Sequence, residues 1–198
     1  MKTLISVDDF KTYKGINNND EDSKLNTIII NVSSFIKNYC GRTFNDYITT
    51  DKVELLDARI DTQLYLEELP IISITSAEIT SDNVTYTSLT ENEDYFVDYN
   101  LAIIYSASSV AVASDVTYNP LNTRITYKAG FEELPEDLLI ATMDMVEYYR
   151  SEEYTPRKAF SNNSVENLGF RETGGARLPS HIERIIQLYR KILWVLEI

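Results

Sequence analysis

The residue types that most often carry catalysis are sparse and scattered in this chain. It has one cysteine, Cys40, and one histidine, His181, far apart in the sequence. A nucleophilic cysteine works with a nearby base, and a zinc site needs several Cys or His ligands, so we predict neither. Because a lone cysteine cannot form an internal disulfide, we expect Cys40 to be a buried apolar side chain in a protein that folds in a reducing compartment.

Other residues suited to ligand binding lack the spacing that binding needs. The run from Asn17 to Asp22 offers oxygen ligands without the central glycine and terminal glutamate of a calcium loop. The segment from Gly174 to Arg177 lacks the lysine of a phosphate-binding loop. Carboxylates are numerous enough to contain the acid pair of a glycosidase-like hydrolase, although the sequence fixes no distance between them. We therefore predict no catalytic, metal-binding or cofactor-binding residue.

Charge is unevenly distributed along the 198 residues. Residues 1–149 contain 10 Lys and Arg against 25 Asp and Glu, a net charge of −15, whereas residues 150–198 contain 8 against 6, a net charge of +2. An acidic body does not bind phosphate backbones tightly, because that affinity comes from Lys and Arg. The sequence also lacks an apolar run of the roughly 20 residues that span a membrane, and it lacks a signal peptide. We expect a soluble protein of the cytoplasm that binds no membrane and no specific nucleic acid.

Helix signals occur near both ends of residues 1–150. Ser6 and Asp9 have the spacing of a capping box, which predicts a helix over 7–14 that ends at Gly15. An apolar stripe with three- and four-residue spacing predicts a second helix over 21–40, ended by Gly41. A proline at position 135, followed by acids and a further stripe, predicts a third helix over 135–150.

Between these helices, from residue 51 to 128, the apolar period changes to two. The alternating pairs are Val53 and Leu55, Leu64 and Leu66, Ile72 and Ile74, Val84 and Tyr86, Val97 and Tyr99, Ile103 and Tyr105, and Ile125 and Tyr127. This pattern predicts short strands in an antiparallel meander, with a turn at Asp98–Leu101 in which Asn100 tolerates a positive φ. Such strands bury one face, against the helices or another subunit. Exposed edges and tyrosines suit an interface, and we select Tyr86, Tyr99 and Tyr105 as inter-subunit candidates.

The C-terminal part of the sequence predicts a loop and one more helix. Residues 151–178 have no sustained periodicity and are expected to form a long functional or mobile loop. A helix over 179–198 is expected to start near Ser180, capped with Glu183, and its apolar stripe continues to the last residue. A free terminus frays unless something holds it, so this stripe either packs on its own core or docks on another chain. The partner-binding candidates are Tyr189, Ile192, Leu193, Trp194, Leu196 and Ile198.

Together these elements predict an α+β fold, a small bundle of about four helices with an antiparallel β-sheet inserted between the second and third. Five segments within it resemble, in order and spacing, the head-to-tail connector proteins of tailed double-stranded-DNA bacteriophages, also called adaptors or head-completion proteins. The segments are Leu4–Lys11, Ser33–Phe44, Leu69–Ile74, Asp94–Asp98 and Ile125–Phe131. The resemblance covers roughly residues 4–150, and the expected connector core is residues 1–150; residues 179–198 would form a C-terminal helix or arm.

This resemblance implies a structural virion protein without enzymatic activity or cofactor. Its subunits, typically twelve, would form a ring in the neck that joins the portal to the tail and extends the DNA channel, and they would assemble in the host cytoplasm. The implied partners are further copies of the chain, the portal protein and the next neck or tail protein, while DNA passes through without specific binding. In this family the C-terminal region commonly faces the portal. The alternatives are another neck or tail-completion protein of the virion, or a carboxylate-dependent hydrolase.

Overall fold

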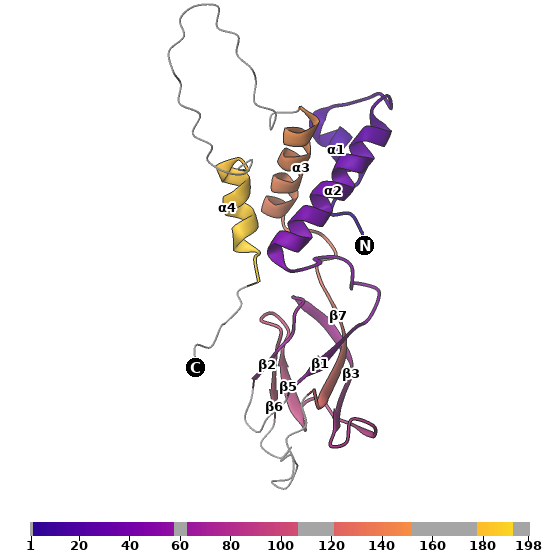
Figure 1. Ribbon diagram of the computed structural model, residues 1–198, viewed down its shortest axis with the longest axis vertical. Coiled ribbons are helices and arrows are strands. Elements are labelled where there is room, and N and C mark those ends of the chain that lie inside the picture. The colour runs from indigo at the N-terminus through magenta and orange to yellow at the C-terminus, as the bar shows by residue number, and fades with distance from the viewer. Residues whose placement is uncertain (1, 58–62, 107–120, 152–177, 192–198) are drawn as a thin grey trace, which may run out of the picture. The chain divides into compact units, whose positions relative to one another are not determined.

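The computed structural model describes residues 2–57, 63–106, 121–151 and 178–191, which divide into two units (Figure 1). The helical unit is built from residues 3–40 and 136–190, and the β unit from residues 41–135 together with Lys2 and Lys191. The strands are thus inserted between the second and third helices, and the predicted α+β fold class is confirmed. Within the described ranges, no helix has both the length and the apolarity needed to cross a lipid bilayer.

The helical unit contains four helices in its described part. They are α1 (Val7–Lys14), α2 (Asp22–Cys40), α3 (Glu136–Arg150) and α4 (Ser180–Leu188). At the start of α1 the Asp9 N–H donates to Ser6 Oγ at 3.1 Å, and the Ser6 N–H donates to the Asp9 carboxylate at 2.9 Å. Both helix-ending glycines are left-handed, Gly15 with φ 68° and Gly41 with φ 66°. The predicted capping box and the predicted ends of α1 and α2 are therefore confirmed.

One apolar face of each helix forms the core of the helical unit. Its buried residues include Phe10, Leu25, Ile29, Val32, Ile36, Cys40, Leu138, Ala141, Met145, Val146, Ile182 and Ile186. The spacing of three and four residues along α2 places its members on one side of the helix, as predicted. Cys40 is 1% exposed, and its thiol lies 3.5 Å from the carbonyl oxygen of Ile186. It is the buried small side chain that the sequence predicts.

The start of α4 differs from the prediction. Ser180 is the first residue inside the helix, and Pro179 occupies the capping position without a side-chain hydrogen bond. A residue inside the helix cannot cap it, so the predicted capping box between Ser180 and Glu183 is wrong. Glu183 still lies in the first turn, where the helix dipole favours an acid.

The end of α4 also differs, because the helix stops at Leu188. The N–H groups of Tyr189 and Arg190 donate to the carbonyls of Ile186 and Gln187, at 3.1 and 3.3 Å. These bonds reach back three residues instead of four, so they tighten the last turn and end the helix. The prediction that the helix continues through residues 189–191 is wrong. Residues 192–198, and nearly all of the loop expected at 151–178, lie outside the described residues.

Two antiparallel sheets make up the β unit. The strands are β1 (Lys52–Leu56), β2 (Gln63–Tyr65), β3 (Ile71–Thr80), β4 (Tyr86–Ser88), β5 (Tyr95–Asp98), β6 (Ile103–Ser106) and β7 (Thr123–Ala129). A four-stranded sheet has the order β1-β7-β3-β4, and a three-stranded sheet has the order β2-β6-β5. The expected single meander is wrong, because the last strand, β7, pairs between β1 and β3. Two sheets that pack face to face can cover each other's apolar sides, which one meander cannot do for itself.

The core of the β unit lies between these sheets. It consists of Leu66, Ile71, Ala77, Tyr95, Ala102, Ile104, Ile125, Tyr127 and Ala129. Burial alternates along β7, where Ile125 and Tyr127 are buried and their neighbours are half-exposed. In Figure 1 the three-stranded sheet lies on one side of the β unit and β7 and β3 lie on the other. Each sheet therefore has an outer face that points away from the other sheet.

The hairpin between β5 and β6 forms at the predicted turn. The Asp98 carboxylate accepts hydrogen bonds from the N–H groups of Asn100 and Leu101, at 3.0 and 2.9 Å. This side chain fixes the middle of the turn, and the positive φ falls two residues beyond Asn100, on Ala102 with φ 54°.

Where the chain enters and leaves the β unit, its two ends are hydrogen-bonded to each other. The Phe131 N–H donates to the carbonyl of Phe44 at 2.7 Å. Beside this bond Gly130 has φ 119°, and a Cβ added there would lie 2.3 Å from the Phe44 oxygen. Only glycine fits this closure.

Candidate interaction surfaces

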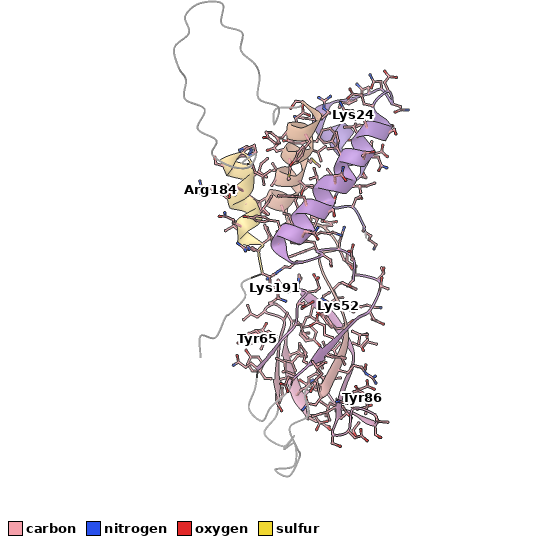
Figure 2. The ribbon with its side chains drawn as sticks, in the orientation of Figure 1. Lys24, Lys52, Tyr65, Tyr86, Arg184 and Lys191 are labelled. Atoms are coloured by element: carbon pink, nitrogen blue, oxygen red, sulfur yellow. The ribbon has the colours of Figure 1, made fainter. Side chains whose placement is uncertain are left out.

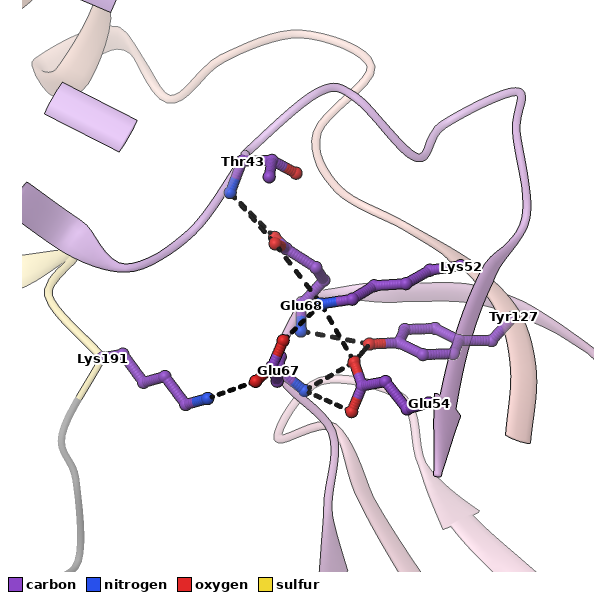
Figure 3. A network of polar contacts seen from close by, with 7 residues as sticks. All are labelled: Thr43, Lys52, Glu54, Glu67, Glu68, Tyr127 and Lys191. Atoms are coloured by element: carbon purple, nitrogen blue, oxygen red, sulfur yellow. Dashed lines mark hydrogen bonds and ion pairs between the residues drawn. The ribbon is translucent and has the colours of Figure 1, made fainter. Parts of the chain in front are cut away.

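Three acidic side chains of the β unit gather around Tyr127 and Lys52, two of them buried and one, Glu67, about half exposed (Figure 3). Glu54 and Glu68 are only 8% and 3% exposed. The Tyr127 hydroxyl donates to the Glu54 carboxylate and accepts a hydrogen bond from the Glu68 N–H at 3.2 Å. Lys52 Nζ lies 3.0 Å from Glu54 and 2.7 Å from Glu67. One lysine and one phenol thus hold three carboxylates together, and we call these five residues the carboxylate network.

The carboxyl groups of the network differ in acidity. Burial raises the pKa of Glu68, although the N–H of Thr43 and the charge of Lys52 oppose this rise. The hydrogen bond from Lys52 lowers the pKa of Glu67. Burial also raises the pKa of Tyr127, and its hydrogen bond to a carboxylate raises this pKa further. Neighbouring carboxyls with opposite shifts are a pattern typical of acid–base catalysis, so this network is where a hydrolase site would have to be.

The surroundings of the network show a structural role instead. Glu68 accepts the Thr43 N–H at 3.1 Å, and Glu54 accepts the Glu67 N–H at 3.2 Å. Lys191 adds an ion pair to Glu67 at 3.4 Å. The protein's own groups therefore cover both buried carboxylates and leave no side open to a substrate. Across the parts of the chain that the structure describes, no cluster of three or more His, Cys, Asp or Glu is arranged to hold a metal ion.

Apolar side chains lie on the outer face of the four-stranded sheet. Val53 is 58% exposed and Leu55 is 47% exposed, while Glu54 between them points into the core. The register pairs Val53 with Thr126 and Leu55 with Arg124, and paired residues share a face. The usual arrangement, with polar residues outside, is thus reversed on β1. We call this surface the four-stranded face; its residues are Val53, Leu55, Ser76, Glu78, Arg124, Thr126 and Lys128.

The outer face of the three-stranded sheet is aromatic. Tyr65 is 53% exposed and Phe96 is 48% exposed. The register places Tyr105 beside Phe96, and Ile103 beside Tyr65. We call this surface the three-stranded face; its residues are Gln63, Tyr65, Phe96, Asp98, Ile103 and Tyr105. Large exposed apolar side chains that cluster on one sheet face are typical of a surface that another protein covers.

The three tyrosines selected from the sequence do not form one site. Tyr105 belongs to the three-stranded face. Tyr99 lies in the turn after β5, where its hydroxyl donates to Glu91 at 2.7 Å, and this bond raises the pKa of Tyr99 to about 12. The ring of Tyr86, on β4, lies 3.8 Å from the guanidinium of Arg124. Figure 2 shows Tyr65 and Tyr86 on opposite sides of the β unit.

Several interface candidates were not identified from the sequence, namely Val53, Leu55, Tyr65 and Phe96. Phe96 could have been noticed, because it stands between two apolar neighbours, Tyr95 and Val97. Three consecutive apolar residues in a strand place apolar groups on both faces, which indicates that both faces are covered. Val53 and Leu55 gave no such signal, because alternation shows that they share a face without showing which face it is.

Of the C-terminal candidates, Tyr189 lies in the described part of the chain. Its hydroxyl donates to the Asp137 carboxylate, and burial followed by this bond raises the pKa of Tyr189. The partner-binding role expected for this residue stays a prediction. The remaining candidates lie outside the described residues: Ile192, Leu193, Trp194, Leu196 and Ile198.

Comparison with known proteins gives consistent results. The model of the head completion protein family matches residues 3–192. The head completion protein of Escherichia phage T5 is 21% identical over 189 residues, which are 96% of this chain and 99% of that protein. Two solved structures share the fold. The neck of an empty GTA (gene transfer agent) particle with C6 symmetry has a TM-score of 0.58 at 15% identity, with 96% of this chain and 90% of that chain covered. The neck of a native GTA particle with C12 symmetry has a TM-score of 0.56 at 16% identity, with 94% and 88% covered.

These matches decide between the binding and catalytic interpretations. Head completion is an assembly role and not a reaction, so the hydrolase alternative is set aside. The carboxylate network is correspondingly a structural feature of the β unit, and the exposed sheet faces are the surfaces to which a function can be assigned. The match extends over nearly the whole sequence, and the chain belongs to the head completion protein family, a family of structural virion proteins.

Proposed function

We propose that this chain is the subunit of a ring in the neck of a tailed-phage virion or a related particle, and that the ring joins the portal to the tail. The family match over residues 3–192 carries the proposal. It is supported by the two structures of similar fold, which are particle necks with C6 and C12 symmetry. The C12 symmetry of the second structure favours a ring of twelve copies.

In such a ring the chain would line part of the channel through which DNA passes. The net charge of −15 over residues 1–149 supports passage without binding, because phosphate backbones are held by Lys and Arg and repelled by acids. A ring structure with these acids on its outer surface would remove this part of the proposal.

The proposal is tested by the mass of the purified chain with and without a portal ring from the same virus. Light scattering at moderate salt should show a discrete portal-bound species with close to twelve added copies. A chain that stays monomeric when it is alone is compatible with the proposal, because an acidic body repels itself until a template gathers the copies. Failure to bind an intact portal ring would contradict portal joining and favour another neck or tail-completion role.

For the portal contact we propose residues 189–198, as the sequence predicts. Removal of residues 192–198 leaves the hydrogen bond between Tyr189 and Asp137 intact, so the helical unit should melt as before while portal binding is lost. Trp194→Ala alone should weaken binding by about 2 kcal/mol or more, the size of an interface hot spot. Unchanged portal binding by the shortened chain would contradict this assignment.

The second candidate is another component of the same neck, which binds a neighbouring ring instead of the portal. The two candidate functions differ in copy number and in contact partner. Cross-linking in assembled particles would join this chain to the portal in the first case and to a tail component in the second.

A further inference from the structure

The β unit has two outer faces on opposite sheets that each carry exposed apolar side chains, and this arrangement suits a ring. A ring of identical subunits needs two different surfaces on each copy, so that one surface of a copy meets the other surface of the next. A surface that pairs with itself would stop at a dimer. The three-stranded face and the four-stranded face meet this requirement, since they belong to one unit, differ in composition and point away from each other.

The two faces are also complementary in chemistry. The three-stranded face presents aromatic rings, with Tyr65 and Phe96 about half exposed. The four-stranded face presents aliphatic Val53 and Leu55 beside Lys128, whose strand position is on the same side. Aliphatic side chains pack well on aromatic rings, and a lysine or arginine adds a favourable contact with a ring face.

Charge supports the same pairing. Between Gly41 and Pro135, the described residues include four bases, Arg42, Lys52, Arg124 and Lys128, among many more acids. Two of the four, Arg124 and Lys128, lie on the four-stranded face, where Arg124 forms an ion pair with Glu78 of the same face at 2.6 Å. No ion pair of Lys128 with another described residue is present. Because Glu78 balances Arg124, Lys128 gives this face a single net positive charge in an otherwise acidic unit, so the face can meet an acidic neighbour without repulsion.

The three-stranded face provides such a neighbour. Asp98 lies in its outer row, in register with Ile103. Glu91 is held beside this sheet by the Tyr99 hydroxyl at 2.7 Å. An acidic face with aromatic side chains thus meets a face with two aliphatic side chains and one net positive charge, which favours contact between unlike faces over contact of either face with itself.

We infer that the three-stranded face of one copy packs on the four-stranded face of the next copy, and that this contact closes the ring. The inference rests on the proposed ring, and it adds which surfaces touch. Phe96 and Tyr65 are the central aromatic residues on one side, and Val53, Leu55 and Lys128 receive them on the other.

The test uses the full chain with one face blocked at a time. Phe96→Asp and Leu55→Asp each place a charge on one face at an exposed position, so both variants should melt like the wild type. Each should weaken self-association at least about tenfold, because a charge would be buried in an apolar contact. Val84→Asp is the matched control, because Val84 is 80% exposed in the turn between β3 and β4, and this variant should assemble normally. If either aspartate variant unfolds, Phe96→Ser or Leu55→Ser replaces it.

A mixture of the two blocked variants gives the sharpest result. The Phe96→Asp chain keeps its four-stranded face, and the Leu55→Asp chain keeps its three-stranded face. At a concentration where the wild type self-associates, the two together should form one dimer and nothing larger in sedimentation velocity, while each alone stays monomeric. A dimer of either variant alone would show that a face pairs with itself, and the inference would be wrong.

Cysteine cross-linking extends the test to weak association. A chain with both Leu55→Cys and Phe96→Cys should give a ladder of oligomers with a bifunctional thiol reagent, on the portal ring or at high concentration, whereas each single-cysteine chain should give none. The native Cys40 is buried and should not interfere. If the wild type forms the ring and either blocked variant does too, the faces are wrong and the proposed function stands. If the wild type forms no ring even on the portal, the proposed function itself fails.

Discussion

Tyr127→Phe is the substitution that most directly tests the carboxylate network. The ring of Tyr127 is fully buried, and phenylalanine fills the same space, so the change removes only the hydroxyl. That hydroxyl donates to the Glu54 carboxylate and accepts the Glu68 N–H. We expect the loss of both bonds to lower the free energy of unfolding.

The size of this loss follows from the two partners. A hydrogen bond to a charged group contributes about 1.5–3 kcal/mol, and a buried N–H left without an acceptor costs about 1–3 kcal/mol. Glu54 retains Lys52 and the Glu67 N–H, which reduces the loss on its side. We therefore expect the free energy of unfolding to fall by about 3 kcal/mol in total. With a urea m-value of about 1–3 kcal/mol/M, the unfolding midpoint should fall by roughly 1–3 M.

The assay is urea unfolding followed by circular dichroism, with Tyr99→Phe as the matched control. The Tyr99 hydroxyl also donates to a carboxylate, that of Glu91, but on the surface, so its removal should change the free energy of unfolding by about 0.5 kcal/mol or less. Equal midpoints for the two variants would refute the reasoning, because buried and exposed hydroxyls would then contribute alike.

Three further predictions concern stability. Gly130→Ala should lower the free energy of unfolding by about 3 kcal/mol or more, and Gly15→Ala by about 1 kcal/mol. Both glycines have a positive φ, but only at Gly130 would an added Cβ lie against the Phe44 carbonyl, so similar melting temperatures for the two variants would contradict this. Glu68→Gln should stabilise the protein at pH 7, because the raised pKa of Glu68 means that the folded state disfavours the ionised carboxyl. The gain in stability should shrink as the pH falls towards the ordinary glutamate pKa. A variant less stable than the wild type at pH 7 would contradict this explanation. Ser6→Ala should cost about 1 kcal/mol in denaturant unfolding through loss of the α1 cap, whereas no change would show that the cap is dispensable.

Local signals made the helical unit largely predictable. The hydrogen bonds between Ser6 and Asp9 involve residues three apart, and the left-handed Gly41 follows the helix that it ends, so both can be inferred from neighbouring residues. The end of α4 was missed because its apolar pattern continues beyond Leu188 while the backbone does not. Periodicity records which side chains would share a face, and it does not require the helix to form.

The arrangement of the strands depends on distant partners, and this limits prediction. Whether Val53 or Glu54 points inward is decided by Tyr127, which lies far along the chain on β7. The separation into two sheets likewise depends on β7 pairing between β1 and β3. The alternation within a single strand shows neither which side points inward nor which strands share a sheet. The exposed apolar side chains on the two outer faces were therefore recognised only in the structure.

The hydrogen bond between Phe131 and Phe44 also has a consequence for the order of folding. Helices α2 and α3 pack together although roughly 95 residues separate them, and closing a loop of that length costs about 4 kcal/mol in chain entropy. If the β unit folds first, this bond brings the ends of the long loop together and most of that cost is already met. The β unit would then act as a folding template for the bundle, and slow steps in its strand pairing would set the rate for the whole chain.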